Sequence, residues 1–130
     1  MIVDVSNQIF SELFTLLDGM ATISRPNQDN PLEYPYVTFD DFDNGDIAES
    51  KDTSGVKYTS IGFEIQIYTK GDTRMTDAKE LRLLIDEKLS GEHGFLRTTS
   101  QKIPNLRDDS IYRYVIRYEG IVDENEKVYN

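Results

Sequence analysis

The residues with the clearest potential for chemistry are four aspartates that follow a short apolar segment. The segment EYPYVTFDDFDNGDIAES runs from Glu33 to Ser50, and its aspartates fall within seven residues: Asp40, Asp41, Asp43 and Asp46. Carboxylate oxygens are the ligands that Ca²⁺ and Mg²⁺ prefer in proteins. A metal site is therefore the first hypothesis to test against the spacing.

A calcium loop of the EF-hand type does not fit this spacing. Such a loop needs acidic residues at positions 1, 3 and 5, glycine at position 6 and glutamate at position 12. A loop that starts at Asp41 has Gly45 at position 5 and Asp52 at position 12. A loop that starts at Asp40 has Phe42 at position 3. Both registers are excluded.

A two-metal site needs carboxylates that converge on one face. Asp41 and Asp43 would share a face if a strand continued through them, with Glu64 and Glu49 as possible further ligands. No basic residue that would bind a phosphate accompanies them. The pattern favours a solvated strand end that opens a loop, and a small metal-dependent phosphodiesterase or nuclease remains the alternative.

Other catalytic and nucleotide-binding motifs do not stand out in the sequence. The single histidine, His93, lies in the glycine-flanked stretch SGEHGF and is a poor general base without an obvious carboxylate partner. The chain has no cysteine, which excludes disulfides, thiolate zinc sites and a cysteine nucleophile. Its glycines form no phosphate-binding loop. We therefore expect a protein that is not an enzyme and that has no cofactor and no metal.

The length and composition indicate a single globular domain over residues 1–130. A net charge of −10 repels phosphate backbones, so we expect no sequence-specific nucleic-acid partner. No apolar run is long enough to span a membrane, so we expect no membrane partner. The N-terminus lacks the basic start of a signal peptide, which predicts a chain that stays in the cytoplasm of its cell.

The charge is unevenly spread along the chain. Residues 1–69 carry 12 acidic and 3 basic residues, a net charge of −9, whereas residues 70–117 carry 8 acidic and 10 basic residues, a net charge of +2. Residues 118–130 carry a net charge of −3. Such segments favour pairing between copies of the chain, and the alternative is that they only keep the chain soluble.

The hydrophobic periodicity predicts two helices and four strands. In chain order, these are a helix that starts at about Val5 and ends before Gly19, strands over 34–42 and 57–70, a helix over 71–91, and strands over 94–103 and 110–122. The order α-β-β-α-β-β predicts an α+β domain, in which a mostly antiparallel four-stranded sheet packs with two helices. The strict alternation from Ile61 to Tyr68 predicts that the odd-numbered face of that strand is buried.

Three connecting or terminal segments are expected to lie outside these elements. Residues 22–33 should form an irregular arm, residues 43–56 a mobile acidic loop and residues 123–130 a flexible C-terminal tail.

The last strand brings aromatic and basic residues together. Three tyrosines share one face and either lie over the core beneath a helix or form a protein contact: Tyr112, Tyr114 and Tyr118. On the other face, Arg113 and Arg117 are expected to pair with Glu64 of a neighbouring strand or with an acidic edge of another subunit. The possible subunit-interface residues are Asp41, Asp43, Asp46, Glu49, Arg113 and Arg117.

The order of elements resembles the tail terminator and tail completion proteins of long-tailed bacteriophages and prophages, which are small head–tail joining proteins. The resembling pieces are a short amphipathic helix followed by PLEYPYVTF, FEIQIYTK, TDAKELRLLIDEKL and SIYRYVIRYEGIVDE. They cover most of the chain, from about Val5 to Val122.

This resemblance implies an α+β subunit that assembles as a ring on the end of the tail tube, stops its polymerisation and docks to the head connector. The implied partners are other copies of the chain, the tail-tube protein and the head connector protein. The implied location is the virion tail, assembled in the bacterial host cytoplasm. Another head–tail connector or a minor tail subunit is the second interpretation within this class. A negative lining of a ring lumen would let DNA pass without adhering.

Overall fold

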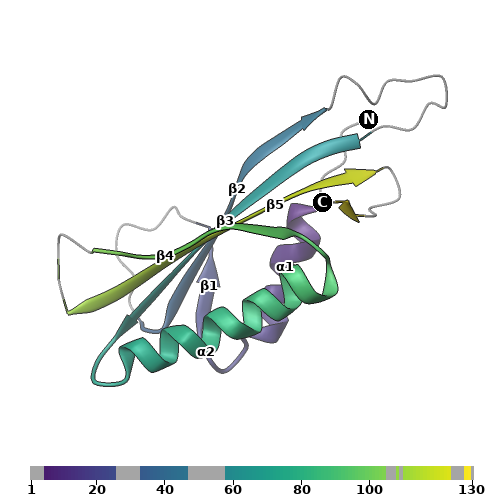
Figure 1. The fold of residues 1–130 in the computed structure, drawn as a ribbon. Coiled ribbons are helices and arrows are strands. Elements are labelled where there is room, and N and C mark those ends of the chain that lie inside the picture. The colour runs from purple at the N-terminus through teal and green to yellow at the C-terminus, as the bar shows by residue number, and fades with distance from the viewer. Residues whose placement is uncertain are drawn as a thin grey trace, which may run out of the picture.

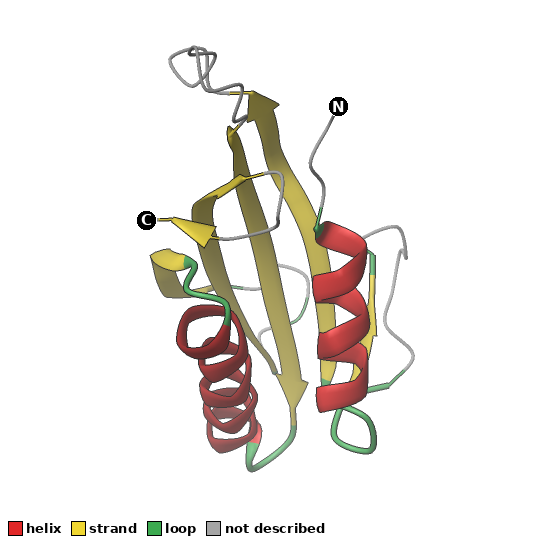
Figure 2. Cartoon of the chain, turned by 90° about the vertical axis from the view of Figure 1, so that its right-hand side faces the viewer, coloured by secondary structure: helices red, strands yellow, loops and turns green. Residues whose placement is uncertain are grey.

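The structure is a computed structural model that describes residues 5–25, 33–46, 58–104, 108, 110–123 and 128–129, with 43–46 and 129 described by backbone alone. A sheet with the strand order β1-β2-β3-β5-β4 is covered on one face by two helices, and β6 pairs with β5 (Figures 1 and 2). The elements in chain order are α1 (Ser6–Leu16), β1 (Thr22–Ser24), β2 (Tyr36–Asp46), β3 (Tyr58–Lys70), α2 (Arg74–Asp86), the π-helical turn η2 (Glu87–Glu92), β4 (Leu96–Ile103), β5 (Ile111–Asp123) and β6 (Val128–Tyr129).

The predicted fold, a mostly antiparallel four-stranded sheet in the order α-β-β-α-β-β, is wrong. β1 lies in the segment that was expected to be irregular, and it pairs in parallel with β2, so the sheet is mixed. Ile23 stands opposite Val37 in this pairing and is buried in the core. Three residues are too few to produce a readable alternation, which is why the sequence pattern does not reveal this strand.

The core lies between the helices and one face of the sheet. The predicted buried face of β3 is confirmed, because its four large apolar residues are at most 1% exposed: Ile61, Phe63, Ile65 and Ile67. Phe39 of β2 and Ile116 of β5 stand on either side of Ile65, so one buried row crosses three strands. The helices contribute Ile9, Leu13 and Leu17 from α1, and Ala78, Leu81 and Ile85 from α2. Each large apolar side chain in this core contributes roughly 1.5–3 kcal/mol of burial free energy.

The long strands extend past the part of the sheet that the helices cover. The paired ends of β2 and β3 reach beyond both helices (Figure 2). β2 runs to Asp46, whose partner is Thr59, so residues 43–46 form strand where a loop was expected. The remainder of that predicted loop, 47–56, lies outside the described residues. Within the predicted tail, Val128 pairs with Val122 of β5.

The two helices end in different ways, α1 in a turn that contains a glycine and α2 in a change from α-helix to π-helix. Gly19 has a φ of 82° in the turn after α1, in line with the predicted end of that helix. The second predicted helix is α-helical only to Asp86 and continues as η2 to Glu92. Among the described residues, neither helix is long and apolar enough to cross a membrane.

Candidate functional site

Asp41, the first candidate of the acidic segment, is held by an arginine on the helix-covered side of the sheet. Nη1 of Arg25 lies 3.2 Å from Oδ1 of Asp41, and Nη2 donates to Oδ1 of Asn7 at 3.2 Å. The guanidinium also lies 5.2 Å from the ring centre of Phe10 and 5.1 Å from that of Phe39. Asp41 therefore belongs to a contact between the start of α1 and β2.

A β-bulge separates Asp41 from Asp43. Asp41 pairs with Phe63, whereas Asp43 pairs with the next residue of β3, Gly62. Residues two apart share a face only where a strand alternates regularly, and the bulge breaks that alternation between Asp41 and Asp43. The regular strand on which the expectation of a shared face depended is interrupted, because Phe42 is the extra residue of the bulge.

Of the carboxylates proposed for a metal site, Asp41 and Glu64 do not converge. Glu64 stands opposite Asp40 and pairs with Arg117, while Asp41 pairs with Arg25. Glu49 lies outside the described residues. Within the described part of the chain, no group of three or more histidine, cysteine or acidic residues is placed to hold a metal ion. Asp41 and Glu64 instead belong to two separate ion pairs.

The arginines of β5 form a polar layer on the face of the sheet that the helices leave open. The expected pair is confirmed for Arg117, whose Nη2 lies 3.4 Å from Oε1 of Glu64. Arg113 instead donates from Nε to Oε1 of Gln66 at 2.8 Å, and its guanidinium lies 5.5 Å from the ring centre of Tyr68. The Tyr68 hydroxyl donates to the same Gln66 oxygen at 2.8 Å. Burial raises the pKa of Tyr68, so this hydroxyl stays protonated and acts as a donor.

An exposed aromatic ring interrupts this polar layer. Phe42 is 43% exposed, and its ring lies over Gly62, where an added Cβ would be 2.5 Å from Cζ of the ring. The guanidinium of Arg117 lies 5.2 Å from the ring centre. The bulge thus delivers one apolar side chain to the open face beside the acidic end of β2.

On the covered face, Tyr118 closes the core beneath α2. Its hydroxyl donates to Oδ1 of Asp86 at 2.8 Å, and Nη1 of Arg97 lies 3.3 Å from the same oxygen. Burial, followed by the bond to Asp86 and its negative charge, raises the pKa of Tyr118 far above the usual value. This tyrosine therefore belongs to the core, the first of the two interpretations given above.

Tyr114 and Tyr112 lie on the same face of the sheet as Tyr118, nearer the start of β5. The Tyr114 hydroxyl accepts a hydrogen bond from Nη1 of Arg82 at 2.6 Å and lies 2.7 Å from Oγ of Ser100. Tyr112 stacks beside Tyr114 at 6.5 Å, with Nζ of Lys102 at 5.3 Å from its ring centre. Between these rings and α2 lies a hollow of about 240 Å³, which we call the cationic hollow, lined by Met75, Thr76, Ala78, Lys79, Arg82, Tyr112 and Tyr114.

His93 ties the end of η2 to α1. Its Nε2 lies 2.9 Å from Oε1 of Glu12, and Nζ of Lys88 lies 3.9 Å from the same oxygen. Burial opposes the ionisation of Glu12, but the hydrogen bond and charge of His93, with help from Gln8 and Lys88, lower the pKa of Glu12. The only histidine of the chain thus joins two helical elements.

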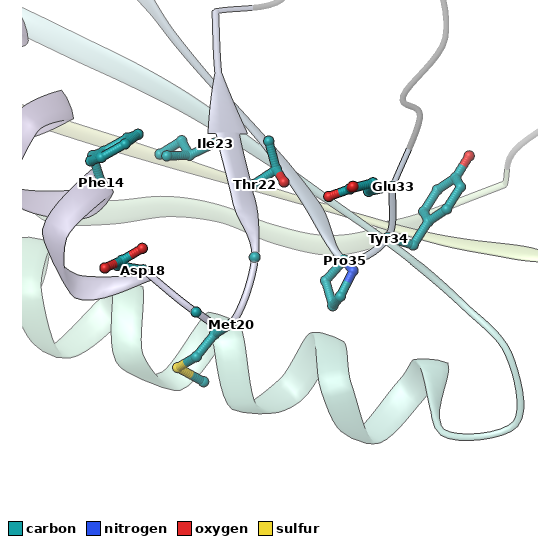
Figure 3. Close-up of a pocket in the computed structure, with 10 residues that line it drawn as sticks. Phe14, Asp18, Met20, Thr22, Ile23, Glu33, Tyr34 and Pro35 are labelled. Atoms are coloured by element: carbon teal, nitrogen blue, oxygen red, sulfur yellow. The ribbon is translucent and has the colours of Figure 1, made fainter.

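A second and larger hollow of about 400 Å³ lies beside β1, between the end of α1 and the turn before β2 (Figure 3). We call it the acidic hollow, and its lining residues are Phe14, Asp18, Gly19, Met20, Ala21, Thr22, Ile23, Glu33, Tyr34 and Pro35. Asp18 and Glu33 approach it from opposite sides of β1. Phe14 is 57% exposed and Met20 is 41% exposed at its rim.

Sequence reasoning missed two parts of these sites. Arg25 is the only basic residue among the first 50, so its pairing with an acidic segment could have been anticipated. The acidic hollow depends on β1, and the sequence pattern gave no signal for that strand.

Comparison with known proteins adds a fold relationship. No protein-family model matches the chain, and no curated protein matches it. Among solved structures, the chain is similar to one from the virion of a native gene transfer agent (GTA) particle. The TM-score is 0.64 with 15% sequence identity, and the match covers 91% of each chain. This similarity shows a shared fold.

Proposed function

We propose that this protein is a structural, non-enzymatic subunit of a phage or prophage particle that caps the tail tube as a ring and docks to the head connector. The observation that carries the proposal is the fold, which is shared over 91% of both chains with a chain of a gene transfer agent virion. The sequence resemblance to tail terminator proteins supplies the specific role, because the virion match alone concerns the fold.

The side-chain contacts support a structural role. Asp41 and Glu64 are each paired with an arginine, and His93 joins Glu12 across two helical elements. Asp41, Glu64 and His93, which were candidates for chemistry, therefore hold strands and helices together.

The partners of a capping ring define what its surfaces must do. Each subunit contacts two copies of itself, the tail-tube protein below and the head connector above. The open face of the sheet carries Arg113, Arg117 and the exposed Phe42, and the acidic end of β2 adjoins them. We propose that the residues named from the sequence contribute to contacts with neighbouring subunits: Asp41, Asp43, Asp46, Glu49, Arg113 and Arg117. The protein would lie in the virion tail after assembly in the host cytoplasm.

Deletion of the gene tests this role through the length of the tails. Particles made without the protein should carry tail tubes of irregular and excessive length that do not join heads, and expression of the gene from a plasmid should restore both. Electron microscopy of several hundred tails measures the length distribution. Tails of normal length that fail to join heads would instead indicate another head–tail connector. Normal tails that join heads would refute the proposal.

A further inference from the structure

The two hollows lie beside opposite edges of the sheet. β1 and β4 are the two ends of the strand order, and the acidic hollow adjoins β1. The cationic hollow lies under α2 beside the end of β4, where Lys102 stands opposite Tyr114. Both helices cover the same face, with α1 on the β1 side and α2 on the β4 side (Figures 1 and 2).

The acidic hollow combines two carboxylates with apolar rim residues. Asp18 and Glu33 are exposed, and none of the lining residues is basic. Phe14 and Met20 add exposed apolar surface next to them. A surface of this composition fits a partner that offers both cations and apolar side chains.

The cationic hollow has the opposite composition. Lys79 and Arg82 line it, Lys102 lies against the Tyr112 ring at its border, and none of the lining residues is acidic. Met75 is 63% exposed at the rim. This surface is unusual in a chain with a net charge of −10, since most of the molecule would repel an acidic partner.

We propose that these hollows form one contact between subunits, in which the cationic hollow of one copy docks on the acidic hollow of the next. The proposal rests on the ring assembly proposed above and adds to it a contact between the two edges of the sheet, separate from the residues assigned there. Because the halves differ and lie at opposite edges, the contact is heterologous and closes into a ring or continues as a filament. A second copy is the favoured occupant, since it supplies both the charges and the apolar residues that each hollow needs.

Charge reversal on one edge at a time tests this contact. One variant carries Asp18→Lys and Glu33→Lys, and the other carries Lys79→Glu and Lys102→Glu. All four side chains are exposed, so both variants should keep the fold, which circular dichroism checks. Arg82 is left unchanged because it donates to Tyr114.

The wild-type chain should self-associate in sedimentation velocity at low ionic strength, where charge contacts are least screened. Each variant alone should associate at least about tenfold more weakly, because like charges then face each other across the contact. An equimolar mixture of the two variants should restore association, since every contact in an alternating assembly again joins opposite charges. Glu80→Lys, an exposed reversal on α2 outside both hollows, is the matched control and should associate like the wild type.

Three results would overturn the edge contact: a monomeric wild type at every concentration, variants that associate as well as the wild type, or a mixture that stays monomeric. None of them bears on whether the protein caps tails, which the gene deletion decides separately. Conversely, normal tails without the gene combined with restored association in the mixture would leave the contact standing and remove its assigned purpose.

Discussion

Gly120 and Gly62 each lie under a phenylalanine ring, yet we expect an added methyl group to have different effects at the two positions. A Cβ at Gly120 would lie 2.7 Å from Cδ1 of Phe95 and 3.1 Å from Cγ1 of Val128. A Cβ at Gly62 would lie 2.5 Å from Cζ of Phe42. Phe95 is 1% exposed, whereas Phe42 is 43% exposed, so only the second ring has room to move.

The expected costs follow from this difference. Phe95 packs edge-on against Phe63 at 5.2 Å, so Gly120→Ala must displace core side chains, and such overpacking costs about 1–3 kcal/mol of unfolding free energy. At Gly62 the ring swings into solvent, and the loss of its contact is partly offset by roughly 0.5–1 kcal/mol that alanine gains over glycine in a strand. We expect a net change of less than about 1 kcal/mol for Gly62→Ala.

Urea unfolding followed by circular dichroism measures both variants against the wild type. The cost of Gly120→Ala should shrink in a Phe95→Leu background, because the ring atoms that the methyl group meets are then gone, and the coupling energy of the double-mutant cycle reports this directly. Equal stability losses for the two alanine variants, or a Gly120→Ala cost unchanged by Phe95→Leu, would refute the packing argument.

Three further predictions each concern a single side chain. Tyr118→Phe should lower the unfolding free energy by about 1.5 kcal/mol, near the lower end for a bond to a charged group because Asp86 is partly exposed; urea unfolding measures it, and no loss would contradict the bond. Folding lowers the pKa of Glu12. The ionised Glu12 therefore stabilises the fold at pH values above its pKa in the unfolded chain, and this stabilisation is lost as the pH falls through its pKa in the folded chain. The wild type should therefore lose more stability than Glu12→Gln between about pH 5.5 and pH 3, and parallel curves would contradict this. Asp18→Lys should raise the unfolding free energy by about 0.3–1 kcal/mol, because the position follows the negative end of the α1 dipole. The melting temperature should rise slightly as a result, and a lower melting temperature would contradict this.

The parts of the fold that follow from a strong period were predictable. The alternation from Ile61 to Tyr68 identified the buried face of β3, because one residue in two meets the helices. The helix predicted from about Val5 to before Gly19 corresponds to α1, Ser6–Leu16. The pairing of Arg117 with Glu64 followed from the expectation that their strands are neighbours.

The other features of the fold depend on contacts between distant residues, which produce no periodic pattern in the sequence. β1 has three residues and is fixed by its pairing with β2 rather than by its own pattern. The bulge at Phe42 places its ring over Gly62, which lies on another strand, and it interrupts the alternation between Asp41 and Asp43. Both hollows are formed between elements, so no segment of the sequence encodes either one alone.

A cryo-electron microscopy reconstruction of the particle tests the central claim most directly. The account predicts a ring of copies of this chain at the head-proximal end of the tail tube, with the β1 edge of each copy against the β4 edge of its neighbour. Density for this chain elsewhere in the particle, or a tail end built without it, would contradict the account.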